Sequence, residues 1–302
     1  MDLSFPPLTG RTMTDPGSHA LPFRLIRPEP PLAPVIFASP HSGREYPAEM
    51  LARSDLDSLK LRSSEDAFVD DLLSAAPAQG AALLLARLPR AYVDLNRAED
   101  ELDPALIEGV APRAVRNPRV AAGLGVIPRV VSGGRAIQPG KITLAEAEAR
   151  LAAVWRPYHA ALGALIADTR LRFGHALVLD MHSMPSDAVS GMGAGRPQIV
   201  LGDRFGTSAG RATVARIEAC FLAEGLRVQR NAPFAGAYVA RHYGRPAENV
   251  EVVQIEIDRS LYMDEARIVR SSDFTRFAAT MGRIVARLAR IGRGREDGLA
   301  AE

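Results

Sequence analysis

Apolar segments of strand length alternate along this chain with segments whose apolar residues recur at helical spacing. Strands are predicted at residues 34–39, 81–88, 91–95, 176–183, 197–202, 226–229 and 250–258, and helices near residues 64–73, 143–173, 207–224 and 273–290. Such alternation is typical of a sheet covered by helices on both faces. We therefore expect a single-domain α/β protein with a mostly parallel or mixed central sheet. Pro157 predicts a kink in the longest helix.

The two ends of the chain and one internal stretch lack these patterns. Prolines at positions 6, 7, 16, 22, 28, 30 and 31 predict an extended N-terminal arm over residues 1–33. The α/β domain is then expected to span residues 34–293, and residues 294–302 to form a loose tail. Several glycines punctuate residues 104–142, where we expect active-site loops.

The composition is that of a globular protein with small-molecule partners. Of its 302 residues, 47% are hydrophobic, and the formal net charge of +2 is too small to favour binding to nucleic acid. No apolar run approaches the roughly 20 residues that cross a bilayer, so no membrane partner is expected. The single cysteine, Cys220, excludes a disulfide framework and predicts a cytoplasmic protein. Its apolar neighbours indicate a packed side chain rather than a catalytic thiol. Nothing in the sequence indicates an oligomeric state.

Two histidines occur where predicted strands end. His41 follows the strand at 34–39, and His182 ends the strand at 176–183. Because the carboxyl ends of strands line the ligand crevice of an open α/β sheet, both imidazoles are candidate metal ligands. Asp180 projects to the same side of its strand as His182 and could orient that ring. An equally compatible interpretation is that both histidines cap local backbone groups.

A third metal ligand would be an oxygen donor, and Glu65 or Asp66 is suitable. Spacing does not choose between them, and acids at the start of a helix are also expected for the helix dipole alone. Two imidazoles, one carboxylate and an open position for water define a catalytic zinc site. We therefore expect one Zn²⁺ per chain, with another divalent metal as the alternative.

The predicted strand at 250–258 has an unusual polar face. Gln254, Glu256 and Asp258 alternate with apolar residues, so they project to one side. If that side lines the crevice, Glu256 is a candidate general base. If the strand lies at an exposed sheet edge, its polar face has no catalytic meaning.

Candidate anion-binding residues follow another predicted strand. Asn96 and Arg97 offer an amide beside a planar guanidinium, which can grip a carboxylate with paired hydrogen bonds. Arg135 and Arg241 are candidates for holding a second anionic group. A single arginine is more often a solvated surface residue, so the combination matters more than any one of them.

Together these residues resemble the N-formylglutamate amidohydrolases, also called N-formylglutamate deformylases. The resemblance extends from about Pro34 to Glu265. It depends on Ser-Pro-His-Ser-Gly at 39–43, Ser-Glu-Asp-Ala-Phe-Val-Asp at 64–70, Ala-Tyr-Val-Asp-Leu-Asn-Arg at 91–97, Asp-Met-His-Ser at 180–183, Gly-Ala-Tyr-Val-Ala-Arg-His-Tyr-Gly at 236–244 and Gln-Ile-Glu-Ile at 254–257. The family is distantly similar to zinc carboxypeptidases and aspartoacylases, which implies a zinc-carboxypeptidase-like fold. Zinc carboxypeptidases have their acidic ligand three residues after the first histidine, where this chain has Arg44.

The resemblance implies hydrolysis of N-formyl-L-glutamate to formate and L-glutamate, a late step in one route of histidine breakdown. It implies a metal on His41, His182 and either Asp66 or Glu65, with Glu256 as the base. The substrate-binding residues that it implies are Asn96, Arg97, Arg135, Tyr238 and Arg241. The alternatives are a related metallo-exopeptidase or N-acyl-amino-acid amidohydrolase and, in a different class, a catalytically silent ligand-binding protein of the same fold.

Overall fold

A run of apolar residues forms the fully buried strand β6, in which all nine residues are buried. In the computed structural model, which describes residues 21–111 and 117–292, this strand lies at the centre of a seven-stranded sheet. Across the sheet the order is β1 (Phe23–Ile26), β3 (Ala82–Ala86), β2 (Val35–Ser39), β6 (Ala176–Met184), β9 (Val250–Asp258), β7 (Ile199–Gly202) and β8 (Val228–Arg230). The four strands from β3 to β9 are parallel, whereas β1 at one edge and the β7–β8 pair at the other run in the opposite direction.

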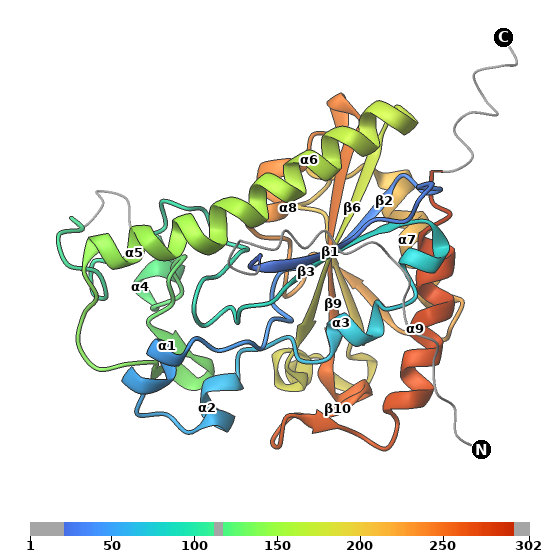
Figure 1. Cartoon of the computed structure of the whole chain (residues 1–302). Helices are drawn as coiled ribbons and strands as arrows, with labels where there is room; N and C mark the ends of the chain where they lie inside the picture. The colour runs from blue at the N-terminus through green and yellow to red at the C-terminus, as the bar shows by residue number, and fades with distance from the viewer. Residues whose placement is uncertain (1–20, 112–116, 293–302) are drawn as a thin grey trace, which may run out of the picture.

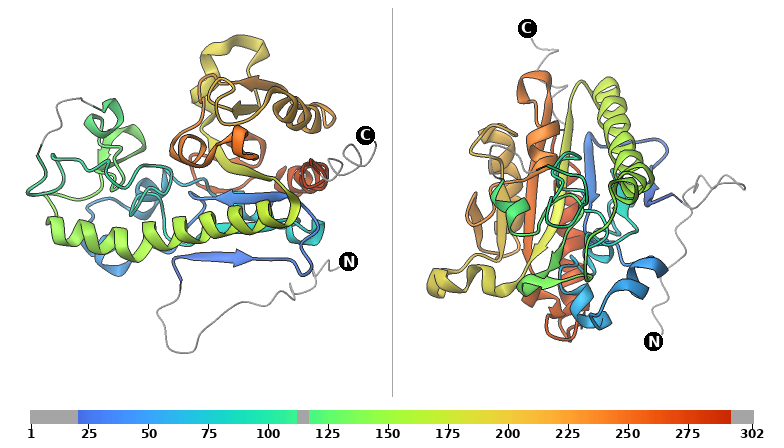
Figure 2. Two further views of the ribbon diagram at one scale, coloured as in Figure 1. Left: turned by 90° about the horizontal axis from the view of Figure 1, so that it is seen from above. Right: turned by 90° about the vertical axis from the view of Figure 1, so that its left-hand side faces the viewer.

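Helices cover both faces of the sheet (Figures 1 and 2). One face packs against α5 (Leu144–Arg150), α6 (Arg156–Phe173) and α8 (Tyr238–Tyr243), and the other against α3 (Val69–Leu72), α7 (Arg211–Leu222) and α9 (Phe274–Leu288). Each helical layer encloses its own apolar core with the sheet. The expected α/β architecture is confirmed. In the parts of the chain that the structure describes, no helix is both long and apolar enough to cross a membrane.

Shorter elements lie in the connecting segments. They are the helices α1 (Ala48–Arg53), α2 (Ser58–Arg62) and α4 (Pro118–Ala121), the two-stranded pairs β4 (Val130–Val131) with β5 (Arg135–Ala136) and β10 (Met263–Asp264) with β11 (Val269–Arg270), and 3₁₀ turns at Pro77–Gln79, Ser132–Gly134, Ser186–Gly195, Pro246–Glu248 and Arg259–Leu261. Four of these, α4, β4, β5 and the 3₁₀ turn at Ser132–Gly134, divide the stretch at 104–142 that was predicted as loops.

On the face of the sheet toward α6, the buried side chains change from apolar to polar along the strands. In β6, Val178 packs into the apolar core, whereas Asp180 and His182 follow on the same side. In the neighbouring strand β9, Val252 packs into that core and Glu256 lies further along on the same side. The opposite face is apolar from Leu177 to Met181 in β6 and from Val253 to Ile257 in β9. The sheet therefore has a buried polar region at the carboxyl ends of its parallel strands.

The predicted strand at 91–95 is wrong. This segment forms turns, in which the Tyr92 amide donates to the Pro89 carbonyl and the Asp94 amide donates to Val126 O at 2.8 Å. The apolar side chains are buried as a strand's would be, for example Val93 and Leu95. Turn hydrogen bonds here satisfy the backbone groups that a sheet partner would otherwise satisfy.

The predicted helix at 64–73 is largely wrong. Only α3 is helical, and Phe68 before it has a left-handed φ of 65°. The Asp66 amide instead donates to the carbonyl of His41 at 3.0 Å. Glu65 and Asp66 are therefore in the irregular connection between α2 and α3. They are not in the first turn of a helix, so a favourable interaction with a helix dipole does not explain them.

The predicted N-terminal arm contributes to the sheet. Strand β1 lies within it and pairs antiparallel with β3, from Phe23 opposite Ala86 to Ile26 opposite Leu83. The fold therefore begins before residue 34. Residues 1–20 of the arm and the predicted tail at 294–302 lie outside the described residues.

A π-helical turn lies just before Pro157, where the sequence predicted a kink. Leu151–Trp155 forms this turn between α5 and α6, so that the three segments continue as one long helix (Figure 2). Proline lacks an N–H group and crowds the preceding turn, and the wider π turn lies directly before it. At the helix start, the Thr143 hydroxyl accepts a hydrogen bond from the Glu146 amide at 3.1 Å, as a capping residue does.

Leu179→Ala in β6 tests the central position of this strand. Leu179 is 0% exposed, so we expect its truncation to lower the free energy of unfolding by about 2–5 kcal/mol. Leu171→Ala is the matched control, because Leu171 is 88% exposed on α6. Urea denaturation measures both. Equal effects of the two substitutions would contradict the assignment of β6 to the core.

Candidate active site

The carboxyl ends of the parallel strands bring distant residues to one buried cavity. His41 follows β2 by two residues, and His182 in β6 lies directly opposite Glu256 in β9. The cavity is lined by His41, Asp66, Arg90, Asn96, Arg97, Arg119, His182, Ser183, residues 234–237, Gln254 and Glu256. Since β9 lies between β6 and β7, the interpretation of its polar face as an exposed sheet edge is wrong.

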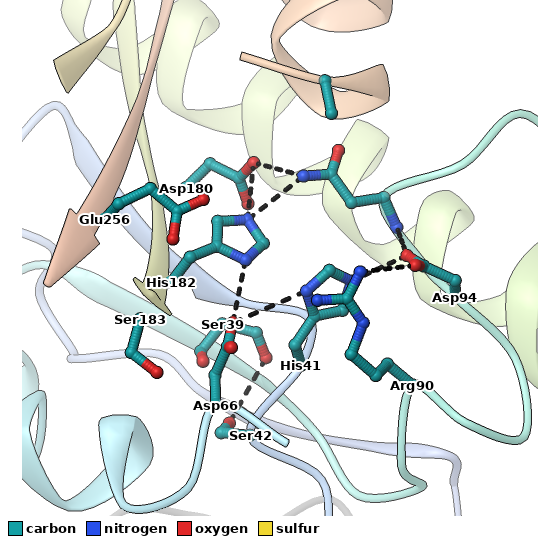
Figure 3. Close-up of polar contacts among 12 residues, drawn as sticks. Ser39, His41, Ser42, Asp66, Arg90, Asp94, Asp180, His182, Ser183 and Glu256 are labelled. Carbon is teal, nitrogen blue, oxygen red and sulfur yellow. Dashed lines mark hydrogen bonds and ion pairs between the residues drawn. The ribbon is translucent and has the colours of Figure 1, made fainter. Parts of the chain in front are cut away.

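His41, Asp66 and His182 are buried and point toward one another (Figure 3). One possible ligand atom from each lies within 4.8 Å of the others. Asp66 Oδ2 is 3.0 Å from Nδ1 of His182 and 3.5 Å from Nδ1 of His41. This group could bind a metal ion.

A further carboxylate orients each imidazole from the other side of the ring. Nε2 of His41 lies 2.7 Å from Asp94 Oδ1, and Nε2 of His182 lies 3.1 Å from Asp180 Oδ2. A carboxylate there keeps a proton on Nε2 and leaves Nδ1 to serve as a ligand. Nδ1 of His41 is buried and has no hydrogen-bond partner among the described residues. The residues present therefore fit a metal ion.

The geometry distinguishes Asp66 from Glu65. Glu65 Oε1 accepts a hydrogen bond from the Tyr46 hydroxyl at 2.7 Å, and Arg62 Nη2 lies 3.0 Å from its Oε2. Its carboxylate is therefore engaged away from the two histidines. Asp66 Oδ1 accepts from Nη2 of the buried Arg259 at 3.0 Å, which leaves Oδ2 facing the histidines.

The charges of this group depend on one another. Burial opposes ionisation of Asp66, but its contacts with His182 and His41 hold the pKa of its carboxyl well below the usual value. Burial likewise opposes charge on His182, yet Asp180 and Asp66 raise its pKa well above the usual value. The raised pKa favours the protonated form of His182, and a bound cation would take the place of the proton on its Nδ1.

Glu256 is a separate carboxylate that lines the same cavity. Its Oε1 accepts a hydrogen bond from Gln254 Nε2 at 2.8 Å, and Figure 3 shows its side chain beside His182. Burial raises the pKa of its carboxyl above the usual value. Glu256 is therefore placed, and its pKa shifted, in the way a general base requires.

The side-chain amide of Asn96 is hydrogen-bonded within the protein, whereas Nε of Arg97 has no such bond among the described residues. The Asn96 amide nitrogen donates to Asp180 Oδ2 at 3.2 Å and to Gln254 Oε1 at 3.3 Å, and its oxygen accepts from the Val239 amide. Arg97 Nε is buried without a hydrogen-bond partner among the described residues, and Asp94 Oδ2 is 4.0 Å away. Burial lowers the pKa of Arg97. Asn96 holds other site residues in place, and Arg97 is free to bind an anion.

Two side chains from the long helix support this segment. Trp155, in the π-helical turn, donates through Nε1 to the Arg97 carbonyl at 3.0 Å. His159 Nε2 lies 3.0 Å from the Leu95 carbonyl. Burial lowers the pKa of His159 to about 3, so its ring is neutral and can donate through Nε2. The carbonyls on both sides of Asn96 are therefore fixed.

Three of the predicted substrate-binding residues lie outside the cavity lining. Arg135 is exposed and donates to the Ser63 hydroxyl at 3.3 Å. Arg241 lies 3.6 Å from Glu101 and is about half exposed, with 54% of its side chain accessible. The Tyr238 ring packs into an aromatic cluster that includes Trp155. Their roles in binding substrate stay predictions.

The sequence analysis missed several residues of the site. Asp94 falls in the segment mistaken for a strand, and Arg90, which donates to Asp94 Oδ2 at 2.7 Å, directly precedes that segment. Arg259 follows β9 directly, and its position after a site strand was the only available signal. Arg119 comes from α4, where no local pattern marked it.

Asp66→Asn and Glu65→Gln test which acid belongs to the metal-binding group. Asp66→Asn should lower affinity for a divalent metal by at least about 10-fold because a charged ligand is lost. Glu65→Gln should retain near wild-type affinity. Competition with a chromophoric chelator measures both, and circular dichroism controls for folding. The reverse order of affinities would identify Glu65 as the ligand.

Comparison with known proteins agrees with this geometry. A family model described as N-formylglutamate amidohydrolase matches residues 33–263. N-formylglutamate deformylases of Pseudomonas aeruginosa and Pseudomonas putida are 32% and 28% identical over 235 residues, which cover 77% of this chain and 83% and 82% of those proteins. The crystal structure of N-formylglutamate amidohydrolase from Ralstonia eutropha JMP134 is 36% identical, with a TM-score of 0.83 over 90% of this chain and 98% of that one. A structure from Agrobacterium tumefaciens, 17% identical over 88% of this chain and 96% of that one, shares the fold with a TM-score of 0.59. This chain belongs to the N-formylglutamate amidohydrolase family.

Proposed function

We propose that this protein hydrolyses N-formyl-L-glutamate to formate and L-glutamate. The observation that carries the proposal is one cavity that contains a buried His–Asp–His group, the separate carboxylate of Glu256 and the Nε of Arg97, which has no hydrogen-bond partner among the described residues. Amide hydrolysis on an anionic substrate needs a carbonyl activator, a base and a cation. The names of the Pseudomonas and Ralstonia relatives supply the substrate.

The metal that we assign is one Zn²⁺ per chain, held by His41, Asp66 and His182. Two imidazoles and a carboxylate are typical ligands of catalytic zinc, and Mn²⁺ or Fe²⁺ accepts similar donors. When bound, such an ion lowers the pKa of water and polarises a carbonyl oxygen. Asp94 and Asp180 hold the two imidazoles in the orientation that ligation requires.

Glu256 acts as the base in this proposal. It accepts a proton from the water molecule that attacks the formyl carbon, and it returns a proton to the glutamate nitrogen as the C–N bond breaks. Formate and L-glutamate are then the products. The hydrogen bond from Gln254 to Oε1 restrains the carboxylate and leaves Oε2 available for proton transfer.

Two arginines position the substrate and stabilise charge. Arg97 binds the α-carboxylate, which supplies the hydrogen-bond acceptor that its Nε lacks. Arg90 faces the same cavity with one Nη fixed by Asp94, and its positive charge stabilises the carbonyl oxygen as negative charge develops there.

The cellular setting that we propose is histidine breakdown in the cytoplasm, where the lone Cys220 stays reduced. A metallo-exopeptidase or N-acyl-amino-acid amidohydrolase would use the same residues on another acyl group. A silent ligand-binding protein would keep the cavity without turnover. Activity measurements on different substrates distinguish these alternatives from the proposed deformylase.

The direct test is formate release by the purified protein. The protein should hydrolyse N-formyl-L-glutamate, and it should hydrolyse N-acetyl-L-glutamate and dipeptides much more slowly. A chelator such as dipicolinate should abolish the activity, and added Zn²⁺ should restore it. A coupled formate dehydrogenase assay measures the formate released from N-formyl-L-glutamate, and detection of the released amine measures hydrolysis of the other substrates. Preference for the acetyl substrate or a dipeptide would favour the alternative hydrolases.

Glu256→Gln keeps the size of the side chain and removes the base. We expect kcat to fall by about 10²-fold or more, the range of a positioned general base, with metal content unchanged. Steady-state kinetics and metal analysis on the same preparation provide the readout. A folded, metal-loaded variant with near wild-type kcat would leave the proposed mechanism without its base.

A further inference from the structure

Three arginines line the cavity, and their counterions are distributed unequally. Arg90 is bonded to Asp94 at 2.7 Å, and both oxygens of that carboxylate are engaged, by Arg90 and by His41. Arg97 shares Asp94 only at 4.0 Å. Arg119 has no ion pair within the described part of the chain. The cavity thus holds two guanidinium groups without a carboxylate of their own.

These two groups also repel each other. Burial lowers the pKa of Arg97, and the positive charge of Arg119 lowers it further. Like charges that face one cavity favour an anion between or beside them, because an anion satisfies both the charge and the unpaired donors. Arg97 supplies the buried member of the pair, with its side chain 8% exposed and its Nε unpartnered among the described residues.

The backbone that carries Arg119 is fixed. Its amide donates to the Asn117 side chain at 3.0 Å, and its carbonyl accepts from the Leu124 amide at 2.8 Å. The helix α4 and the turn after it therefore hold the base of the side chain, while the guanidinium reaches the cavity. Arg135 and Arg241, the other candidates for a second anion, do not line this cavity.

We infer that Arg119 determines specificity by binding the side-chain carboxylate of the substrate, while Arg97 binds the α-carboxylate. This inference depends on the proposed function and adds the residue that recognises the acidic side chain of the N-formyl amino acid. A neutral side chain would leave Arg119 without its partner, and a site with an unpaired donor discriminates against such a substrate.

The experiment compares two substrates and three variants of the full-length, metal-loaded protein. Arg119→Gln should lower kcat/KM for N-formyl-L-glutamate by about 10- to 100-fold, the value of a hydrogen bond between charged groups, and change that for N-formyl-L-glutamine by less than about threefold. Arg119→Lys should keep part of the preference for N-formyl-L-glutamate over N-formyl-L-glutamine, because lysine keeps the positive charge that glutamine removes. Arg172→Gln is the matched control, since it removes the same charge from the exposed end of α6.

Binding of the product provides a second readout that does not need turnover. By calorimetry, L-glutamate should bind more tightly than L-glutamine to the wild type, and Arg119→Gln should remove most of that difference. An active wild type whose preference survives Arg119→Gln, or is lost instead in Arg135→Gln or Arg241→Gln, would overturn the inference and keep the proposed function. An inactive wild type that still selects L-glutamate through Arg119 would overturn the proposed function and keep the inference.

Discussion

The carboxylate of Asp66 is the interaction on which the rest of the site depends. A buried carboxylate is strongly unfavourable unless it is paired and hydrogen-bonded, and Asp66 meets this requirement through His41, His182 and Arg259. These partners come from the segment after β2, from β6 and from the turn after β9. The stability of one charge therefore ties together three segments that are distant in the sequence, and the register of the parallel strands holds their partners in place.

The sequence predicted the parts of the site that follow from strand periodicity. His41, His182 and Glu256 occur at or near the ends of strongly apolar strands, and alternation fixes the side to which each projects. Asp66 could not be separated from Glu65, because they are adjacent in an irregular segment that is hydrogen-bonded to the carbonyl of His41, which is distant in the sequence. The overall sheet was predictable for the same reason as the histidines, since long apolar runs have few alternatives.

Loop-borne residues could not be predicted in this way. Arg119 and Arg135 are both arginines of the same glycine-punctuated stretch, and only tertiary packing places the first at the cavity and the second outside it. Asn96 illustrates a related limit. It lines the cavity, and its role in binding substrate stays a prediction, because its amide contacts Asp180, Gln254 and Val239 within the protein.

The π-helical turn at Leu151–Trp155 has a consequence for how this family can vary in length. A π turn holds one more residue than the α-helical turn it replaces, and each residue of an α-helix advances the chain by about 100°. Trp155 and His159 both reach the carbonyls around Asn96. Loss of a single residue here would rotate one half of the long helix against the other. Either Trp155 and His159 would then point away from these carbonyls, or α5 would lose its packing against the core. Homologues that keep the site should therefore tolerate insertions and deletions in surface loops but conserve the residue count of this helix.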